Sequence, residues 1–226
     1  MKTPNPQLRF AVLAADTVLF TIRNGELLVR LIPVHRPPHF VDKSGLPGGL
    51  LLPTETAEQA ALRNLEVKAG IKREHVHIEQ LYTFSGVHRD PRGRVVAVTY
   101  LALAPWEELS QAEQADTDNA RWCTVRRLPK LAYDHNEVLE LALERLRARM
   151  NYTTIASKLL PSEFTLSDLE RAYETLLGKK MDRRNFRKKI LKLKLLKPLG
   201  KKRGGKWRPA ELYAFKGTKV VPIEML

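Results

Sequence analysis

The chain has 226 residues, 43% of them hydrophobic and 28% charged, which is enough to bury one ordinary core and a smaller second one. Its single cysteine, Cys123, excludes an intrachain disulfide and a zinc cluster of the usual cysteine spacing, and it fits a reducing cytoplasm. The apolar run over residues 10–20 is interrupted by Asp16 and Thr17, so we expect neither a signal peptide nor a membrane span there.

The net charge of +14 is concentrated in the C-terminal third of the chain. Residues 1–150 hold 20 basic and 18 acidic side chains, whereas residues 151–226 hold 19 basic and 7 acidic ones. The segment 182–208 alone has 13 basic residues against one acid. Such a field favours a polyanionic partner, because each phosphate contact releases condensed counterions. A solvated basic surface that only aids solubility is the alternative interpretation.

The N-terminal part begins with a predicted β-hairpin. Apolar runs over residues 10–22 and 26–34 flank the pair Asn24-Gly25, which is typical of a type I′ turn. A proline-rich loop follows them. A helix then begins after the cap residue Thr56, which has a glutamine three residues later as in a capping box, and it ends at Gly70.

The rest of the first unit is predicted from shorter patterns. In chain order these are a strand over 77–84, a charged turn over 88–93, a strand over 94–104, an acidic loop over 105–118, a strand over 120–124 and a helix over 135–150. No linker-like composition follows this helix. We therefore place the domain boundary near residue 150, which divides the chain into units over 1–150 and 151–226.

The second unit has the proportions of a helix-turn-helix. A short helix over 153–160 is ended by Pro161, and a second helix over 166–177 has Thr165 as its cap. A short glycine-containing turn then leads into a third helix capped by Asp182. This third helix is the most basic element of the chain.

Phe186, Ile190 and Leu193 recur on the third helix at spacings that place them on one buried stripe. The remaining positions are almost wholly basic, and we expect them to project outward: Arg183, Arg184, Arg187, Lys188, Lys192 and Lys194. Asn185 and Arg187 are the candidates for base reading, because asparagine pairs bidentately with adenine and arginine with guanine. The lysines are the candidates for phosphate contacts.

A wing is predicted after this helix. Apolar segments over 195–199 and 211–215 bracket a basic turn in which Gly204-Gly205 suits a tight reversal. The turn supplies further candidate DNA contacts: Lys201, Lys202, Arg203, Lys206, Trp207 and Arg208. Arg203 or Arg208 is suited to a narrow minor groove, while for Trp207 hydrophobic anchoring of the wing is favoured over base stacking.

The segment 49–71 resembles the Nudix box, the signature of enzymes that cleave nucleoside diphosphates linked to another group. The matching positions are Gly49, Glu55, Arg63, Leu65, Gly70 and Ile71. The catalytic carboxylates of that pattern correspond here to Asn64, Val67 and Lys68, one helix face that offers an amide, an isopropyl group and an ammonium. Magnesium requires several oxygen ligands, so we expect neither a metal site nor hydrolysis by the metal-dependent mechanism.

Loss of the metal site leaves the ligand site open to another use. Lys68, with Arg63 nearby, can supply the positive charge that a diphosphate would otherwise receive from magnesium. A surface lysine held by a salt bridge is an equally consistent interpretation of Lys68. Glu55 is interpreted as a charge that stabilises the dipole of the helix N-terminus.

Over nearly its full length the chain resembles the NrtR family, Nudix-related transcriptional regulators of NAD metabolism. The motifs that carry the resemblance lie at 46–49, 80–84, 89–94, 128–135, 159–161, 164–166, 182–190 and 208–213. The resemblance implies an α+β fold: a Nudix-like α/β/α sandwich with a mixed sheet over 1–150, followed by a winged helix-turn-helix over 151–226. It also implies a cytoplasmic, homodimeric repressor of NAD biosynthesis or salvage genes that requires no cofactor.

In this family the repressor leaves its palindromic double-stranded operator when ADP-ribose binds the Nudix-like domain. Carried over by position, the ligand pocket would be lined by Gly48, Gly49, Arg89, Asp90 and Arg92. Arginines suit diphosphate oxygens, and glycines permit close backbone approach. Taken alone, the segment from Arg89 to Arg92 is typical of an ordinary exposed turn.

Two departures from the family pattern leave other functions open. The aromatic-bearing stretch expected before the Leu46-Pro47-Gly48-Gly49 turn is replaced by residues 41–45, and the Nudix box is more degraded than in members that keep most acids. One alternative is a pyrophosphohydrolase that recruits other acids, Glu107, Glu108 or Asp116. The other is a regulator of the same architecture that senses a sugar derivative.

Overall fold

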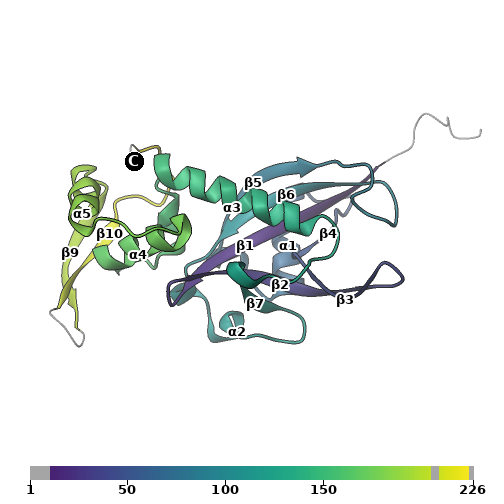
Figure 1. Ribbon diagram of the computed structural model, residues 1–226, viewed down its shortest axis with the longest axis horizontal. Helices are drawn as coiled ribbons and strands as arrows, with labels where there is room; N and C mark the ends of the chain where they lie inside the picture. Colours follow the sequence, from purple (N-terminus) through teal and green to yellow (C-terminus); the bar gives the residue numbers. More distant parts are fainter. Residues whose placement is uncertain (1–10, 205–208, 224–226) are drawn as a thin grey trace, which may run out of the picture.

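The computed structural model describes residues 11–204 and 209–223. Figure 1 shows two units, a sandwich built around a large sheet and a smaller unit of helices with a hairpin, joined by the long helix α3. Among the described residues no helix is long and apolar enough to cross a membrane. The candidate sites lie in the sandwich and on the smaller unit.

The predicted hairpin is confirmed as β1 (Val12–Arg23) and β2 (Glu26–Arg36). Asn24 and Gly25 have φ values of 52° and 77°, and two successive positive φ angles are what a type I′ turn requires. β1 pairs antiparallel with β2 and parallel with β6, so the sheet is mixed as expected. The main path of the sheet runs β3-β2-β1-β6-β5, with β4 paired to β1 and β7 to β2.

The other strands of this sheet are β3 (Phe40–Gly45), β4 (Gly48–Leu50), β5 (His77–Phe84), β6 (Val95–Leu103) and β7 (Arg121–Thr124). β3 and β4 lie where only a proline-rich loop and a glycine turn were expected. β3 has no apolar alternation, and only its last two residues, Ser44 and Gly45, are buried. It is a strand because it pairs with β2, and that non-local pairing leaves no signal in its own residues.

Two helices complete the sandwich, α1 (Ala57–Ala69) and α3 (His135–Tyr152). The alternation of β1 places Leu19 in a buried cluster with Leu65 of α1, whereas Val18 and Phe20 belong to the cluster that contains α3. The sheet is therefore covered on both faces, which is the predicted α/β/α arrangement.

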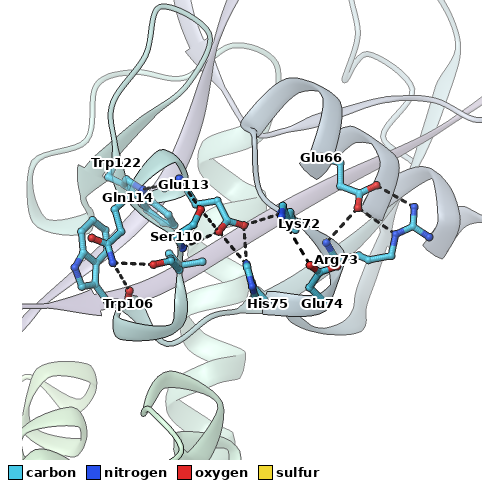
Figure 2. Close-up of polar contacts among 11 residues, drawn as sticks. Glu66, Lys72, Arg73, Glu74, His75, Trp106, Ser110, Glu113, Gln114 and Trp122 are labelled. Carbon is cyan, nitrogen blue, oxygen red and sulfur yellow. Dashed lines mark hydrogen bonds and ion pairs between the residues drawn. The ribbon is translucent and has the colours of Figure 1, made fainter.

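The segment expected to be an acidic loop is an ordered cap on the sandwich. It contains a 3₁₀ turn over Trp106–Glu108 and a short helix, α2 (Gln111–Gln114). Figure 2 shows the reason: the buried carboxylate of Glu113 accepts hydrogen bonds from the backbone nitrogen atoms of Lys72 and Ser110. His75 Nδ1 lies 2.8 Å from the same carboxylate. These contacts tie α2 to the segment that follows α1.

The smaller unit contains α4 (Leu166–Leu177), α5 (Arg183–Lys192) and a three-stranded sheet in the order β8-β10-β9. Its strands are β8 (Phe164–Thr165), β9 (Leu196–Arg203) and β10 (Ala210–Phe215). The expected cap of α4 is confirmed, since Thr165 and Asp168 form a reciprocal capping box. The first predicted helix is instead a 3₁₀ segment, Ile155–Leu159. Two helices and a hairpin make this unit the expected winged helix.

The two units share a continuous apolar cluster. Leu146 and Met150 of α3 belong to the same buried cluster as Leu169 and Tyr173 of α4. The Nε atom of Arg147 also donates to the carbonyl oxygen of Leu176 at 2.8 Å. The winged helix is thus carried on the C-terminal half of α3, while the first turn of α3 lies at the sandwich.

Candidate ligand pocket and nucleic-acid interface

Strand β4, α1 and the first turn of α3 border a pocket of about 520 Å³. The predicted residues Gly48, Gly49, Lys68, Arg89, Asp90 and Arg92 all line it. Arg63, the seventh predicted residue, does not. Asp16, Arg36, Tyr133 and His135 line the pocket as well, although the sequence did not mark them as ligand residues.

The helix face that holds magnesium in the Nudix pattern does not fit a metal in this chain. Asn64 is buried and its Nδ2 atom donates to the carbonyl oxygen of Ala60, while Val67 is 75% exposed. Lys68 brings an ammonium group to the third position. Within residues 11–204 and 209–223 no cluster of three or more histidine, cysteine or acidic side chains is arranged to hold a metal ion. The residues present therefore suit an anion better than a cation.

Lys68 is half-buried at the floor of the pocket, where its Nζ atom donates to the carbonyl oxygen of Gly48. Burial lowers the pKa of Lys68, and the nearby positive charges of Arg36 and Arg63 lower it further. No carboxylate of the described chain lies within salt-bridge distance of Nζ, so the interpretation as a salt-bridged surface lysine is wrong. The charge of Asp16 favours the charged form of Lys68 from beyond salt-bridge distance, and an incoming anion would add a closer partner.

Gly49 is where Lys68 and Asn64 converge. A Cβ atom added to Gly49 would lie 2.8 Å from both Lys68 Nζ and Asn64 Oδ1, closer than real Cβ contacts. The Oδ1 atom of Asn64 is buried without a hydrogen-bond partner in the described structure. Glycine at position 49 thus allows two polar groups to meet at the pocket floor.

Arg63 is held outside the pocket by Glu55. Its Nε atom donates to Glu55 Oε2 at 2.9 Å, and its Nη2 atom also reaches the carbonyl oxygen of Leu50. The hydrogen bonds from Arg63 hold the pKa of Glu55 at about 2. Glu55 is thus the partner of Arg63 rather than an isolated charge at the helix N-terminus, and the expected contribution of Arg63 to a ligand is not supported by its position.

The loop from Arg89 to Arg92 is held in place by side-chain ion pairs and is not an ordinary exposed turn. The side chain of Arg89 is 4% exposed and donates to Asp134 at 2.7 and 2.8 Å and to Asp16 at 3.2 Å. Asp90 is also buried and accepts from the backbone nitrogen and the Nε atom of Arg92. Arg92 keeps 44% of its side chain exposed, so it is the member of the loop that is free to meet a ligand.

Tyr133 and His135 line the pocket next to this loop. Tyr133 has a φ of 55°, an unusual value for a bulky residue, and its ring lies 4.4 Å from that of Phe40 and 5.3 Å from the Arg92 guanidinium. His135 Nδ1 accepts from the backbone nitrogen of Leu46. Burial opposes ionisation of Asp16, but His135 and Arg89 outweigh burial and lower its pKa. The polar interruption of the apolar run at Asp16 was the sequence signal for this network.

The acids considered for an alternative hydrolase lie elsewhere. Glu108 accepts from the backbone nitrogen of Ser162, and Asp116 accepts from that of Trp122. Glu107 lines a separate cavity between the β1–β2 turn and α4. None of these three carboxylates lines the pocket described above.

On the winged helix, α5 buries Phe186 and Ile190 as predicted, and Leu193 packs half-buried against the same cluster. The exposed positions of α5 include five predicted DNA contacts: Arg183, Arg184, Asn185, Lys188 and Lys192. Arg187, also predicted to project outward, does so only in part, with 38% of its side chain exposed. Its Nη2 atom donates to Ser167 Oγ at 2.8 Å, and its Nε atom lies 3.9 Å from Glu170, so the side chain lies against α4.

The wing differs from the predicted basic turn. β9 extends to Arg203, so Lys201, Lys202 and Arg203 lie on a strand, and all three are exposed. Lys201 donates to Glu163 and Arg203 to Asp168, each at 2.8 Å. The remaining wing candidates, Lys206, Trp207 and Arg208, lie outside the described residues.

Comparison with known proteins identifies both units. Residues 13–142 match the NUDIX domain model, and residues 156–215 match the model of the NrtR DNA-binding winged helix domain. The ADPR responsive transcriptional repressor NtrR of Acinetobacter baylyi is 30% identical over 210 residues, which cover 90% of this chain and 82% of that protein.

Solved structures agree with this result. Shewanella oneidensis NrtR complexed with a 27mer DNA has 34% identity and a TM-score of 0.80, covering 90% of this chain and 93% of that one. The NUDIX domain of the same protein complexed with ADP ribose has 35% identity and a TM-score of 0.52, covering 63% and 93%. With a Nudix domain followed by this winged helix, the chain belongs to the NrtR family of Nudix-related transcriptional regulators.

Proposed function

We propose that this protein represses transcription from a palindromic operator as a homodimer and leaves the DNA when ADP-ribose, or a related nucleotide, binds its pocket. A sensing unit over 1–150 and a DNA-binding unit over 151–226 divide these tasks. The observation that carries the proposal is the basic, exposed face of α5 on a winged helix. The A. baylyi relative, an ADPR responsive transcriptional repressor, and the S. oneidensis NrtR complexed with DNA support repression that responds to ADP-ribose, and we infer NAD biosynthesis or salvage genes as the targets.

The DNA-binding surface is formed by the side of α5 opposite its buried residues. Arg184, Lys188 and Lys192 are exposed there, and in the described chain none of them has an acidic partner. A helix that is anchored by Phe186 and Ile190 and basic on its free side is suited to the major groove. The same side carries Asn185, whose amide remains a candidate for reading adenine.

The pocket supports an anionic ligand with a ring system. Arg36, Lys68 and Arg92 supply positive charge, and Tyr133 offers an aromatic surface. A volume of about 520 Å³ is in the range of small-molecule sites. The co-crystal of the S. oneidensis NUDIX domain with ADP ribose supports the same ligand here, with Lys68 in place of a metal.

We further propose that the protein does not hydrolyse this ligand. The Nudix metal positions carry Asn64, Val67 and Lys68, and the alternative acids lie outside the pocket. Magnesium-dependent release of AMP from ADP-ribose would contradict this part of the proposal. Thermal unfolding with nucleotide and with sugar ligands distinguishes this regulator from one that senses a sugar derivative. Only a ligand that binds the folded state raises the unfolding temperature.

The direct test is selection of bound duplexes from a random library, with and without ADP-ribose. The proposal predicts enrichment of one palindromic motif without ligand and its loss when ligand is present. A variant with Arg184, Lys188 and Lys192 replaced by alanine is the matched control and should enrich nothing. Failure of the native protein to retain any duplex at low salt would contradict DNA binding itself.

A further inference from the structure

Glu170 of α4 lies beneath the basic helix α5. It is 6% exposed and carries its carboxylate between two arginines of that helix. Its Oε1 atom accepts from Arg183 Nε at 3.4 Å, and its Oε2 atom lies 3.9 Å from Arg187 Nε. Oε2 and that Nε atom each lack a hydrogen-bond partner in the described structure. The two groups face each other with their hydrogen-bonding capacity unused.

A buried carboxylate at this position is costly. The neighbouring positions of the same helix, Leu169, Tyr173 and Leu176, are filled by core side chains, so an apolar residue at 170 would avoid the loss of hydration. The long contacts with the two arginines return only part of that loss. A gain in stability therefore does not account for a carboxylate at this position.

Arg187 is held from two directions. Its Nη2 atom donates to Ser167 Oγ at 2.8 Å, and the charge of Glu170 attracts the Nε side. The side chain remains 38% exposed, so part of the planar guanidinium still faces solvent beside α5. A guanidinium fixed in this way loses little conformational freedom when it pairs with the two acceptors of a guanine edge.

We propose that Glu170 is a positioning residue for sequence reading: it holds Arg187, together with Arg183, so that Arg187 pairs with a guanine in the major groove. The inference rests on the proposed DNA binding. In this proposal Arg187, which lies beside the carboxylate of Glu170, reads a base. Arg184 and Lys188, which have no acid beside them in the described structure, contact phosphates. Only the first kind of contact distinguishes one sequence from another.

This assignment predicts that Glu170→Gln affects the operator and a shuffled duplex differently. The amide keeps the shape of the side chain but removes the charge that aligns Arg187, so affinity for the selected operator should fall about 10-fold. Affinity for a shuffled duplex of the same composition should stay equal or rise, because a negative charge near the phosphates is gone. A loss of folding would lower both affinities together with the unfolding temperature.

The experiment measures the operator-to-shuffled affinity ratio for the full chain by fluorescence anisotropy. Glu170→Gln is combined with Arg187→Ala in a double-mutant cycle. Glu174→Gln is the matched control, because it makes the same charge change one turn later on α4, where the acid contacts Lys180 and the backbone nitrogen of Met181. Ser167→Ala, which removes the other support of Arg187, is the second variant.

The inference predicts a reduced ratio in Glu170→Gln and Ser167→Ala, an unchanged ratio in Glu174→Gln, and no further reduction by Glu170→Gln once Arg187 is alanine. Three results overturn it. The first two are an unchanged affinity ratio in Glu170→Gln and an unchanged ratio in Arg187→Ala. The third is that Glu170→Gln reduces the ratio equally in the native protein and in Arg187→Ala. Each leaves the proposed function intact if the native protein still prefers its operator. Absence of any duplex binding would instead defeat the proposed function.

Discussion

The guanidinium of Arg89 donates two hydrogen bonds to the carboxylate of Asp134, at 2.7 and 2.8 Å, and Asp134 is the residue immediately before α3. This pair joins a loop that lines the pocket to the helix that carries the winged helix. Arg89 also reaches Asp16 on β1. We infer that a ligand that displaces this loop acts on the first turn of α3, and that α3 transmits the displacement to the winged helix.

Removing Arg89 should destabilise the sandwich. Arg89→Ala leaves the carboxylates of Asp16 and Asp134, 9% and 12% exposed, without their shared cation, which should lower the free energy of unfolding by about 3 kcal/mol. Urea denaturation of the full chain measures the effect. Arg94→Ala is the control, because Arg94 is exposed and its guanidinium donates to the carbonyl oxygens of Ser85 and Gly86, with no ion pair among the described residues. A loss of less than about 1 kcal/mol for Arg89→Ala would contradict the role of this pair.

Lys68 should contribute to ligand affinity. Lys68→Met removes the ammonium at the pocket floor and should weaken ADP-ribose binding by about 10-fold or more in calorimetric titration. Lys72→Met makes the same change at an exposed lysine four residues later, past the end of α1, and should leave affinity unchanged. Equal affinity in the native protein and Lys68→Met would show that the ligand is bound without this charge.

The same lysine predicts a pH dependence of binding. Burial lowers the pKa of Lys68 in the free protein, and a bound diphosphate favours the charged form and raises that pKa again. Affinity should therefore fall as pH rises through the alkaline range, because fewer molecules carry the charge. Titrations of Lys68→Met over the same range should show a smaller decline, and an identical decline in both proteins would contradict the assignment.

Glu113 should govern part of the acid stability. Burial alone would raise its pKa, but hydrogen bonds from Ser110, Lys72 and His75 hold it at about 2, below the ordinary value of 4.5. A depressed folded-state pKa contributes stability that is present above pH 4.5 and is lost as pH falls toward 2. Glu113→Gln should cost about 2 kcal/mol at neutral pH and flatten this acid-side loss in denaturation curves. An unaltered pH profile would contradict the prediction.

The exposed cations of α5 should set the salt dependence of DNA binding. Replacing Arg184 and Lys188 by alanine removes two phosphate contacts, so the slope of log affinity against log salt should become shallower by about 2. The double variant Lys43→Ala, Lys130→Ala removes two exposed charges from the sandwich and should keep the native slope. Identical slopes for both double variants would place the phosphate contacts elsewhere.

Local patterns in the sequence predicted most of the fold. The Asn24-Gly25 turn, the cap residue Thr165 and the buried stripe of Phe186 and Ile190 each depend on residues close in the chain, and each is confirmed. The strand β3 was missed because its conformation depends on pairing with β2. Residue propensity and periodicity within a segment do not reveal which distant strand it pairs with.

The candidate pocket was predicted in outline but not in its internal contacts. The family pattern located Lys68 and the loop from Arg89 to Arg92. The contacts of Arg89 with Asp16 and Asp134 were seen only in the structure, because these residues are 73 and 45 positions away in the sequence. Arg187 was placed outward because helical periodicity counts residues and does not detect an acid on the neighbouring helix. Ion pairs between elements that are distant in the sequence can be identified only from the three-dimensional structure.

The most direct measurement is an anisotropy titration of the full chain bound to its selected duplex, with ADP-ribose as the titrant. The account predicts release of the duplex as the pocket fills, with the midpoint shifted to higher ligand concentration in Lys68→Met and unshifted in Lys72→Met. Retention of the duplex at millimolar ADP-ribose, by protein shown calorimetrically to have bound the ligand, would contradict the coupling between pocket and winged helix.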